Sequence, residues 1–317
     1  MNPRGILYIA RSASIGDENR VLMDLAAGLC RDAFFPLILS LDDGPLEAWA
    51  AGHEIPVLTM RRGDAALAQA ARDHGVALVH AMAPECARLA RMVGDLLDVP
   101  HSCHVPRPAV DTRIFRPAPV NWEAHLRLRG GAGHVVVILD PSAGGRWWQG
   151  AADDISSRLP DCRFLTLDGC REERADVLRA ADVVVLPSLD AERPRDLLEA
   201  MACAKPVVAA PIGRLPDALV DEQTGLIVPV HQPERLADAV LRVLSDRPLS
   251  QRIGLAGRVR AQAQFSVHRL VVVIQAIYGE MIDRFEPARQ PVPSVETLDE
   301  DLLGDEDDRE SSGVTVQ

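Results

Sequence analysis

The chain has 317 residues, 47% of them hydrophobic and only 4% aromatic, so it can bury a substantial core and is long enough for two domains. Its formal net charge is −12, and no basic stripe with interleaved aromatic residues occurs, which argues against nucleic-acid binding. The apolar run at the start is too short for a signal peptide, and no run approaches about 18 apolar residues, so we expect a cytoplasmic protein without a transmembrane segment.

The first part of the chain alternates short apolar runs with amphipathic segments. We predict strands at residues 5–10, 36–41, 55–60 and 76–79, and helices at residues 21–29, 45–49, 64–74 and 84–97. Short, continuously apolar strands separated by helices indicate a parallel sheet that is covered on both faces. This series therefore predicts a Rossmann-like domain.

Cysteine and histidine residues give no metal-site signal. The six cysteines contain no CxxC pair and fall in predicted strands and helices, so we expect small buried side chains in a reducing compartment. A cluster of His101, Cys103 and His104 lacks a second pair of ligands at zinc-binding spacing.

The second part repeats the alternation around a polar turn. We predict strands at residues 134–139, 163–167, 182–186 and 207–210, and helices at residues 171–180 and from Pro194 onward. Pro187 and Ser188 end the third of these strands, and the segment that follows is polar up to Leu197. Parallel sheets bind anionic ligands beyond the carboxyl ends of their strands, where helix N-termini lie. The polar segment is therefore a candidate ligand site.

The last part of the chain contains two predicted helices and an acidic tail. An amphipathic helix is predicted at residues 233–244, and Ser266 is the predicted N-cap of a second helix that runs to about residue 283. From residue 286 onward, proline, serine and acidic residues dominate without periodicity, which predicts a disordered segment.

The motifs of the second part occur in the order found in glycosyltransferase family four. ADVVVLPS, RPRDLLEAMA, AKPVVA, PIGRLPD and TGLIVP follow one another, and VDTRIF resembles the end of the family's interdomain linker. The chain thus resembles these retaining sugar-nucleotide transferases of the GT-B fold, with fewer βα units. The resemblance implies an α/β architecture of two Rossmann-like domains whose parallel sheets face each other across a cleft. We place a shortened acceptor-side domain at residues 1–113, a nucleotide-sugar-binding domain with a terminal crossover helix at 114–285, and the acidic tail at 286–317.

The resemblance assigns contacts to the ribose and the donor sugar. Glu199 matches the second of two family glutamates that stand eight positions apart, and it would accept hydrogen bonds from ribose hydroxyls. Ala191 replaces the first, so Asp190 or Glu192 would hold the donor sugar instead. Removing one charged hydrogen-bond partner costs about 1.5–3 kcal/mol unless a neighbour substitutes. Alternatively, Asp190, Glu192 and Arg195 form a solvated, charged turn.

Other donor contacts fall on weakly matched loops. Arg146 stands where the family has basic residues that neutralise the diphosphate leaving group, and Gly16 remains from a glycine loop after the first strand. His104 is the nearest match to a histidine that positions the donor sugar, with His101 and His80 as further candidates. Pro194 and Leu198, at the start of the helix that carries Glu199, complete the donor-binding set. Arg146 also fits a surface arginine stacked on a tryptophan, and His104 a hydrogen-bonded structural histidine.

The altered motifs leave two functions open. The resemblance implies a metal-independent retaining glycosyltransferase, without a cofactor, that moves a sugar from a nucleotide-diphospho-sugar to a glycan or lipid-linked acceptor. Such an enzyme is compatible with peripheral contact at the inner face of a membrane. The alternative is a degenerate relative that binds a nucleotide sugar or a partner without turnover, which Ala191 and the weakened basic loop favour. A nicotinamide-dependent oxidoreductase is excluded, because no GxGxxG follows the first strand.

Overall fold

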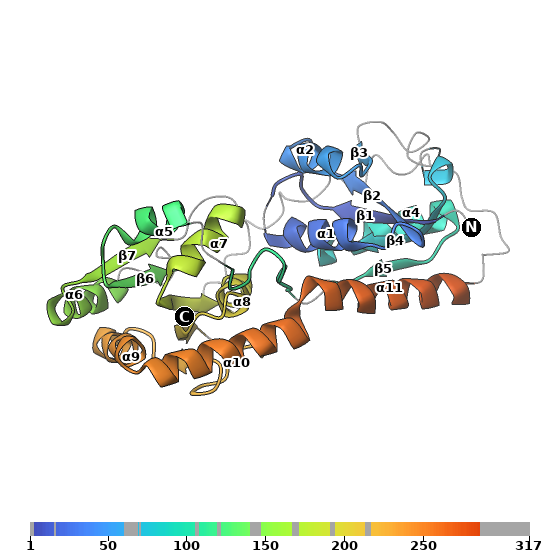
Figure 1. The fold of residues 1–317 in the computed structure, drawn as a ribbon. Coiled ribbons are helices and arrows are strands. Elements are labelled where there is room, and N and C mark those ends of the chain that lie inside the picture. The colour runs from blue at the N-terminus through green and yellow to red at the C-terminus, as the bar shows by residue number, and fades with distance from the viewer. Residues whose placement is uncertain are drawn as a thin grey trace, which may run out of the picture. The chain divides into compact units, whose positions relative to one another are not determined.

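The protein is described by a computed structural model that covers residues 3–15, 17–59, 69, 71–104, 108–118, 122–139, 147–166, 171–190, 194–212 and 217–285. Contacts divide the chain into two compact units. The first comprises Met1–Ala13, Arg31–His104 and Glu280–Gln317, and the second comprises Ser14–Cys30 and Val105–Gly279. Each unit contains one five-stranded parallel sheet (Figure 1). The domain boundaries given above stay predictions.

The first unit is built on a sheet with the strand order β3-β2-β1-β4-β5. Its strands are β1 (Arg4–Ala10), β2 (Phe34–Ser40), β3 (Val57–Thr59), β4 (Val76–Ala81) and β5 (His101–Cys103). Its helices include α2 (Pro45–Gly52), the 3₁₀ turn η2 (Pro84–Cys86) and α4 (Ala87–Leu97). Most of the helix predicted at residues 64–74 lies outside the described residues.

Alternation along the strands separates the two faces of this sheet. Leu7 and Ile9 of β1 pack in one cluster with residues of β2 and β4 and with Val93 of α4. Tyr8 points to the other face, where its ring centroid lies 5.8 Å from that of His80 on β4. Both rings are almost fully buried, so a titratable side chain lies inside this core.

The second unit is built on a sheet with the strand order β10-β9-β8-β6-β7. Its strands are β6 (His134–Ile138), β7 (Cys162–Thr166), β8 (Val183–Asp190), β9 (Val207–Ile212) and β10 (Leu226–Ile227). Its helices include α1 (Asp17–Gly28), α5 (Trp122–Arg129), α6 (Trp148–Arg158), α7 (Arg171–Ala180), α8 (Pro194–Ala202), α9 (Pro233–Ser245) and α10 (Arg247–Phe265). Helix α11 (Val267–Arg284) begins in this unit, and its last residues are grouped with the first.

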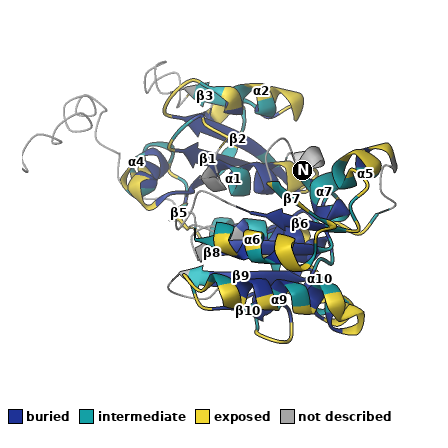
Figure 2. Ribbon diagram, turned by 90° about the vertical axis from the view of Figure 1, so that its left-hand side faces the viewer, coloured by how far each residue is buried: buried dark blue, intermediate teal, exposed yellow. Residues whose placement is uncertain are grey.

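Helices cover both faces of the second sheet. Val136 and Val183 belong to a cluster that includes residues of α6 and α9, whereas Val135 and Val184 belong to a cluster that includes residues of α7 and α8. In Figure 2 the strands of this sheet are largely dark blue, while α6 and α9 also carry exposed residues. The predicted α/β class with parallel sheets is therefore confirmed in both units.

The predicted end of strand β8 is wrong. The strand does not stop at Pro187 but continues to Asp190, with a register shift between Leu186 and Leu189 in its pairing with β9. Such irregularities are where a sheet tolerates proline, because proline cannot donate a ladder hydrogen bond.

Helices α5, α6 and α10 were not among the predicted elements. Helix α10 buries Gly254 and Gly257 next to Leu249 and Ile253, and much of its remaining sequence is polar. Glycine is a poor helix former and adds no apolar periodicity, so the pattern of this helix is weak. The predicted cap of α11 is confirmed, since the Ser266 hydroxyl accepts a hydrogen bond from the Arg269 amide at 3.3 Å.

Two cysteines differ from expectation. Cys86 and Cys203 are buried as predicted, but Cys30 and Cys103 are exposed, because they fall at a helix end and a short edge strand rather than in a core. The predicted acidic tail at 286–317 lies outside the described residues.

Candidate functional site

The strand order of the second sheet places a topological switch point between β6 and β8. The chain runs from β6 outward to β7 and then returns to the other side of β6 for β8, β9 and β10. In open α/β sheets, ligands bind beyond the carboxyl ends of the strands at this point. The segments that leave those ends begin at Leu139 after β6 and after Asp190 in β8. Arg146 and Glu192 lie on these two segments, outside the described residues.

Helix α8 follows β8 and carries a fully buried carboxylate. Leu197 and Leu198 of this helix are 0% and 1% exposed and pack in the core of the second sheet. Glu199 is 0% exposed, although a buried charge is costly unless it is paired. The core face of α8 therefore contains a residue that packing alone does not explain.

Arg174 of α7 is the main partner of this carboxylate. Its Nε and Nη2 donate hydrogen bonds to Glu199 Oε2 at 3.1 and 2.8 Å. The same Nη2 also donates to Asp196, one turn earlier on α8. The guanidinium thus binds two carboxylates that helical spacing places on one face of α8.

Arg195 lies on the other side of Glu199. Its Nε is 3.6 Å from Glu199 Oε1, and its Nη2 forms an ion pair with Asp24 of α1. The residue is only 5% exposed, so the alternative in which it belongs to a solvated turn is wrong for Arg195. The ion pairs with Asp24 and Glu199 hold it in the interior.

Two buried atoms of this cluster lack a hydrogen bond. Neither Glu199 Oε1 nor Arg195 Nε has a partner among the described residues. A buried polar atom without a hydrogen bond lowers the free energy of unfolding by about 1–3 kcal/mol. Such atoms are found where a functional role or a bound ligand explains them. One acceptor and one donor are therefore left side by side.

Burial and charge act in opposite directions on the carboxyl group. Burial raises the pKa of Glu199 above its usual range, and the positive charge of Arg174 offsets part of that rise. Burial also works against the charge of Arg174, but its two carboxylate partners raise the pKa of the guanidinium overall. Arg174 is thus the main group that favours the ionised form of Glu199, and the charge of Arg195 acts in the same direction.

The other predicted site residues are more scattered. His104 is exposed and follows β5 in the first unit, where its backbone carbonyl accepts a hydrogen bond from His80 Nε2 at 2.8 Å. Asp190 ends β8 and Pro194 begins α8, but the side chains of both lie outside the described part, as does Gly16. Of the predicted residues, the structure therefore places Glu199 and Leu198 together on α8 of the second unit.

The sequence analysis did not predict Arg174 or Asp196 as site residues. The signal was present in the spacing of Asp196 and Glu199, which stand three apart on the helix that also buries Leu197 and Leu198. Two acids on one helix face next to buried residues require a cation, but the pattern does not say which of the many arginines supplies it.

The described residues hold no group of three or more histidine, cysteine, aspartate or glutamate side chains that could bind a metal ion. Among the helices that the structure describes, none is long and apolar enough to cross a membrane.

Comparison with known families matches residues 144–246 to the model described as "Glycosyl transferases group 1". This stretch includes the cluster of Arg174, Arg195 and Glu199 and the segment with Arg146. The predicted resemblance is thereby confirmed at the level of a group 1 domain.

Curated relatives match only part of the chain. A D-inositol 3-phosphate glycosyltransferase of Corynebacterium diphtheriae is 39% identical over 109 residues, which cover 34% of this chain and 25% of the relative. A protein of the same name from Stackebrandtia nassauensis is 32% identical over 184 residues, 56% of this chain and 40% of the relative. The chain thus spans well under half of the length of these relatives.

Solved structures share the fold along most of the chain. A glycosyltransferase from Rickettsia africae superposes with a TM-score of 0.74 at 16% identity, covering 90% of this chain and all of that one. Anabaena HepE in complex with UDP gives a TM-score of 0.70 at 16% identity, with 87% and 100% covered. Residues 144–246 are therefore similar to the glycosyl transferases group 1 family, in a chain that shares the α/β fold of these solved glycosyltransferase structures.

Proposed function

We propose that this protein is a retaining glycosyltransferase that moves a sugar from a nucleotide-diphospho-sugar to a glycan or lipid-linked acceptor. The group 1 domain match over residues 144–246, which encloses the buried Glu199 cluster, is the observation that carries the proposal. Family resemblance supports the retaining mechanism, the acceptor class and a location in the cytoplasm, at the inner face of a membrane.

Glu199 Oε1 is the proposed acceptor for a ribose hydroxyl. Arg174 holds the other oxygen, Oε2, through two hydrogen bonds, so the carboxylate has a fixed orientation and one oxygen without a hydrogen bond from the described residues. The neighbouring Arg195 Nε can donate a hydrogen bond to a ribose hydroxyl oxygen. Because Glu199 is fully enclosed, binding must uncover Oε1 before this contact forms.

Charge on the leaving diphosphate must be neutralised in such a reaction. We assign this to Arg146, on the segment after β6 at the switch point, without a metal ion or other cofactor. Asp190, the last residue of β8, or Glu192, two residues later in the sequence, is proposed to hold the donor sugar in place of the glutamate that Ala191 replaces. The resemblance assigns the remaining donor contacts. His104 would position the donor sugar, and the donor-binding set would also include Gly16, Pro194 and Leu198.

Calorimetric titration with UDP, GDP and ADP tests the donor site. UDP is the first probe, because solved structures of HepE contain UDP and UDP-glucose. We expect one nucleotide to bind, and Glu199→Gln to weaken it about ten- to a hundredfold, as for loss of a charged hydrogen-bond partner. Glu234→Gln, at an exposed glutamate of α9 in the same unit, serves as the control. Binding that is equal in all three proteins would refute the role of Glu199.

A non-catalytic nucleotide-sugar-binding protein is the second candidate, favoured by Ala191 at the position of the first family glutamate. The two candidates differ in turnover. Release of free nucleotide from the bound sugar nucleotide, followed over hours with and without lipid or glycan extracts, supports the transferase. Nucleotide binding without any release in either condition supports the binding protein.

A further inference from the structure

A cavity lies at the amino ends of the strands of the second sheet. It has a volume of about 470 Å³ and is lined by His134, the first residue of β6, by Asp182, just before β8, and by Pro206, just before β9. All three positions are at the amino ends of parallel strands, whereas the Glu199 cluster follows the carboxyl end of β8. The cavity is therefore separate from the proposed donor site.

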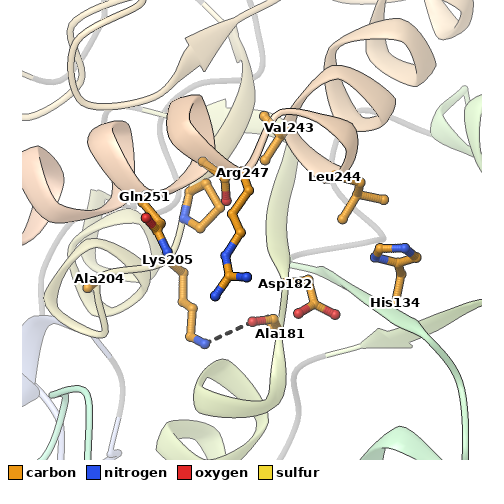
Figure 3. A pocket seen from close by; sticks show the side chains of 11 residues that line it. His134, Ala181, Asp182, Ala204, Lys205, Val243, Leu244, Arg247 and Gln251 are labelled. Carbon is orange, nitrogen blue, oxygen red and sulfur yellow. Dashed lines mark hydrogen bonds between the residues drawn. The ribbon is translucent and has the colours of Figure 1, made fainter.

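Lys205, the only lysine of the chain, reaches into this cavity (Figure 3). Its Nζ donates hydrogen bonds to the carbonyl oxygens of Arg179 and Ala181 at 2.7 and 2.8 Å. An ammonium group has three N–H donors, so one is left without a hydrogen-bond acceptor among the described residues. Its two acceptors are uncharged, and neither compensates the positive charge.

Arg247 contributes a second cation. Figure 3 shows its side chain extending from α10 into the space between Lys205 and Asp182. The guanidinium makes no hydrogen bond or ion pair with the residues that the structure describes. Its planar set of five donors is suited to a carboxylate or phosphate.

The packing of α10 places these groups at the cavity. Arg247, Ser250 and Gln251 line it and share a helix face with Gly254. A Cβ atom on Gly254 would come within 2.5 Å of the Ala204 carbonyl oxygen, so glycine permits the close approach of the helix to the segment before β9. The polar face of the first turns of α10 is thereby held against Lys205.

Asp182, the only acidic residue among those lining the cavity, does not neutralise the two cations. Its Oδ2 accepts a hydrogen bond from the Val135 amide at 2.8 Å and lies 3.0 Å from Arg129 Nη1. Its nearest cation is thus Arg129, and it attracts Lys205 without a direct ion pair. The C-terminal end of α7 adds only about half a negative charge, and Lys205 binds its carbonyls. Two positive charges remain.

We propose that this cavity binds a small organic phosphate, as a site separate from the donor site. A phosphate monoester carries nearly two negative charges, which match Arg247 and Lys205. Ser250 and Gln251 offer hydrogen bonds to the organic part, and Val243 and Leu244 form an apolar wall. The cavity volume is within the range of small-molecule sites. The proposal does not depend on glycosyl transfer.

The single lysine makes the test specific. In the full-length protein labelled with ¹³C-lysine, one Cε signal reports on Lys205. We expect glycerol 3-phosphate to shift this signal in a saturable manner, and Arg247→Gln to weaken the affinity about tenfold or more. Arg252→Gln, on the same helix but outside the cavity lining, is the matched control and should bind as the wild type does.

Two further titrations define the ligand class. Inorganic phosphate should bind more weakly than glycerol 3-phosphate, and equal affinities would overturn the assignment to an organic phosphate. UDP should leave the Lys205 signal in place. The proposal fails if glycerol 3-phosphate does not shift the signal at tens of millimolar, or if Arg247→Gln and Arg252→Gln bind alike.

Discussion

The two sheets have similar strands but differ in whether charged side chains are buried next to them. Both contain five parallel strands, and both pack against helices. The core of the first sheet contains His80, whose pKa is lowered from 6.5 to about 4, chiefly by burial, so the ring is neutral near pH 7. The second encloses Glu199 with two arginines. The first sheet thus avoids a buried charge, whereas the second maintains several.

This difference supports the proposed donor site at the Glu199 cluster. A neutral histidine that donates to a backbone carbonyl satisfies its hydrogen bond without the cost of burying an ion. A buried ion pair is seldom the most stable solution, because desolvation cancels much of the attraction. The cluster around Glu199 is therefore better explained by function than by stability.

The largest expected effect comes from Arg174→Met. Removing one partner of a buried ion pair costs about 3–5 kcal/mol, because the remaining charge stays buried. Trp49 lies in the first unit and the other three tryptophans in the second, so urea unfolding by fluorescence in a Trp49→Phe background reports on the second unit. We expect Arg174→Met to lower the free energy of unfolding of the second unit by this amount. Adding Glu199→Gln should restore part of it.

Arg242→Met provides the control for this experiment. Arg242 pairs with Glu222 at the surface, where both side chains are about half exposed, and such pairs contribute little. If both methionine variants unfold at the same urea concentration, Glu199 is not maintained as a buried charge by Arg174.

The next effect concerns the first sheet and pH. The folded pKa of His80 is lowered, so protonation favours the unfolded chain, and the stability present above pH 6.5 is lost as the pH falls toward about 4. The shift corresponds to about 3 kcal/mol. Trp49 fluorescence, in a variant without the other tryptophans, measures the unfolding free energy of the first unit as a function of pH. His80→Gln should flatten the pH dependence in this window, and an unchanged slope would contradict a neutral His80.

A smaller effect is expected on ligand binding. Glu199→Gln keeps the shape of the side chain but removes its charge, which should cost about 1.5–3 kcal/mol of nucleotide affinity. No comparable change should follow from His80→Gln, because that residue belongs to the core of the first sheet. Equal losses in both variants would mean that the two sheets do not differ in the way described.

The smallest expected effect lies at the start of α10. The Asp246 carboxylate accepts a hydrogen bond from the Leu249 amide at 2.9 Å, and loss of such a cap costs about 1 kcal/mol. Asp246→Ala should lower the unfolding free energy of the second unit by this amount, and Asp246→Asn should retain most of it. A larger loss in Asp246→Asn than in Asp246→Ala would argue against the cap.

The sequence predicted most strands but not the charged cluster. Runs such as Val135–Val137 and Val183–Val185 are β-branched and continuous, so their burial on both faces could be read from composition. Helix α10 was not predicted, because its buried positions include Gly254 and Gly257, which add no apolar periodicity. Family resemblance supplied Glu199, whereas Arg174 depends on which helix packs beside α8, and tertiary pairing leaves no periodic signal.

The edges of the second sheet limit its tendency to add further strands. Strand β10 has only two residues, so little unpaired backbone is presented at that edge. The opposite edge, β7, is longer but carries the exposed charge of Arg163 in its second position. Short and charged edges are the means by which natural sheets avoid aggregation through edge-to-edge pairing. The unit that carries the buried charges is thus also protected against self-association through its backbone.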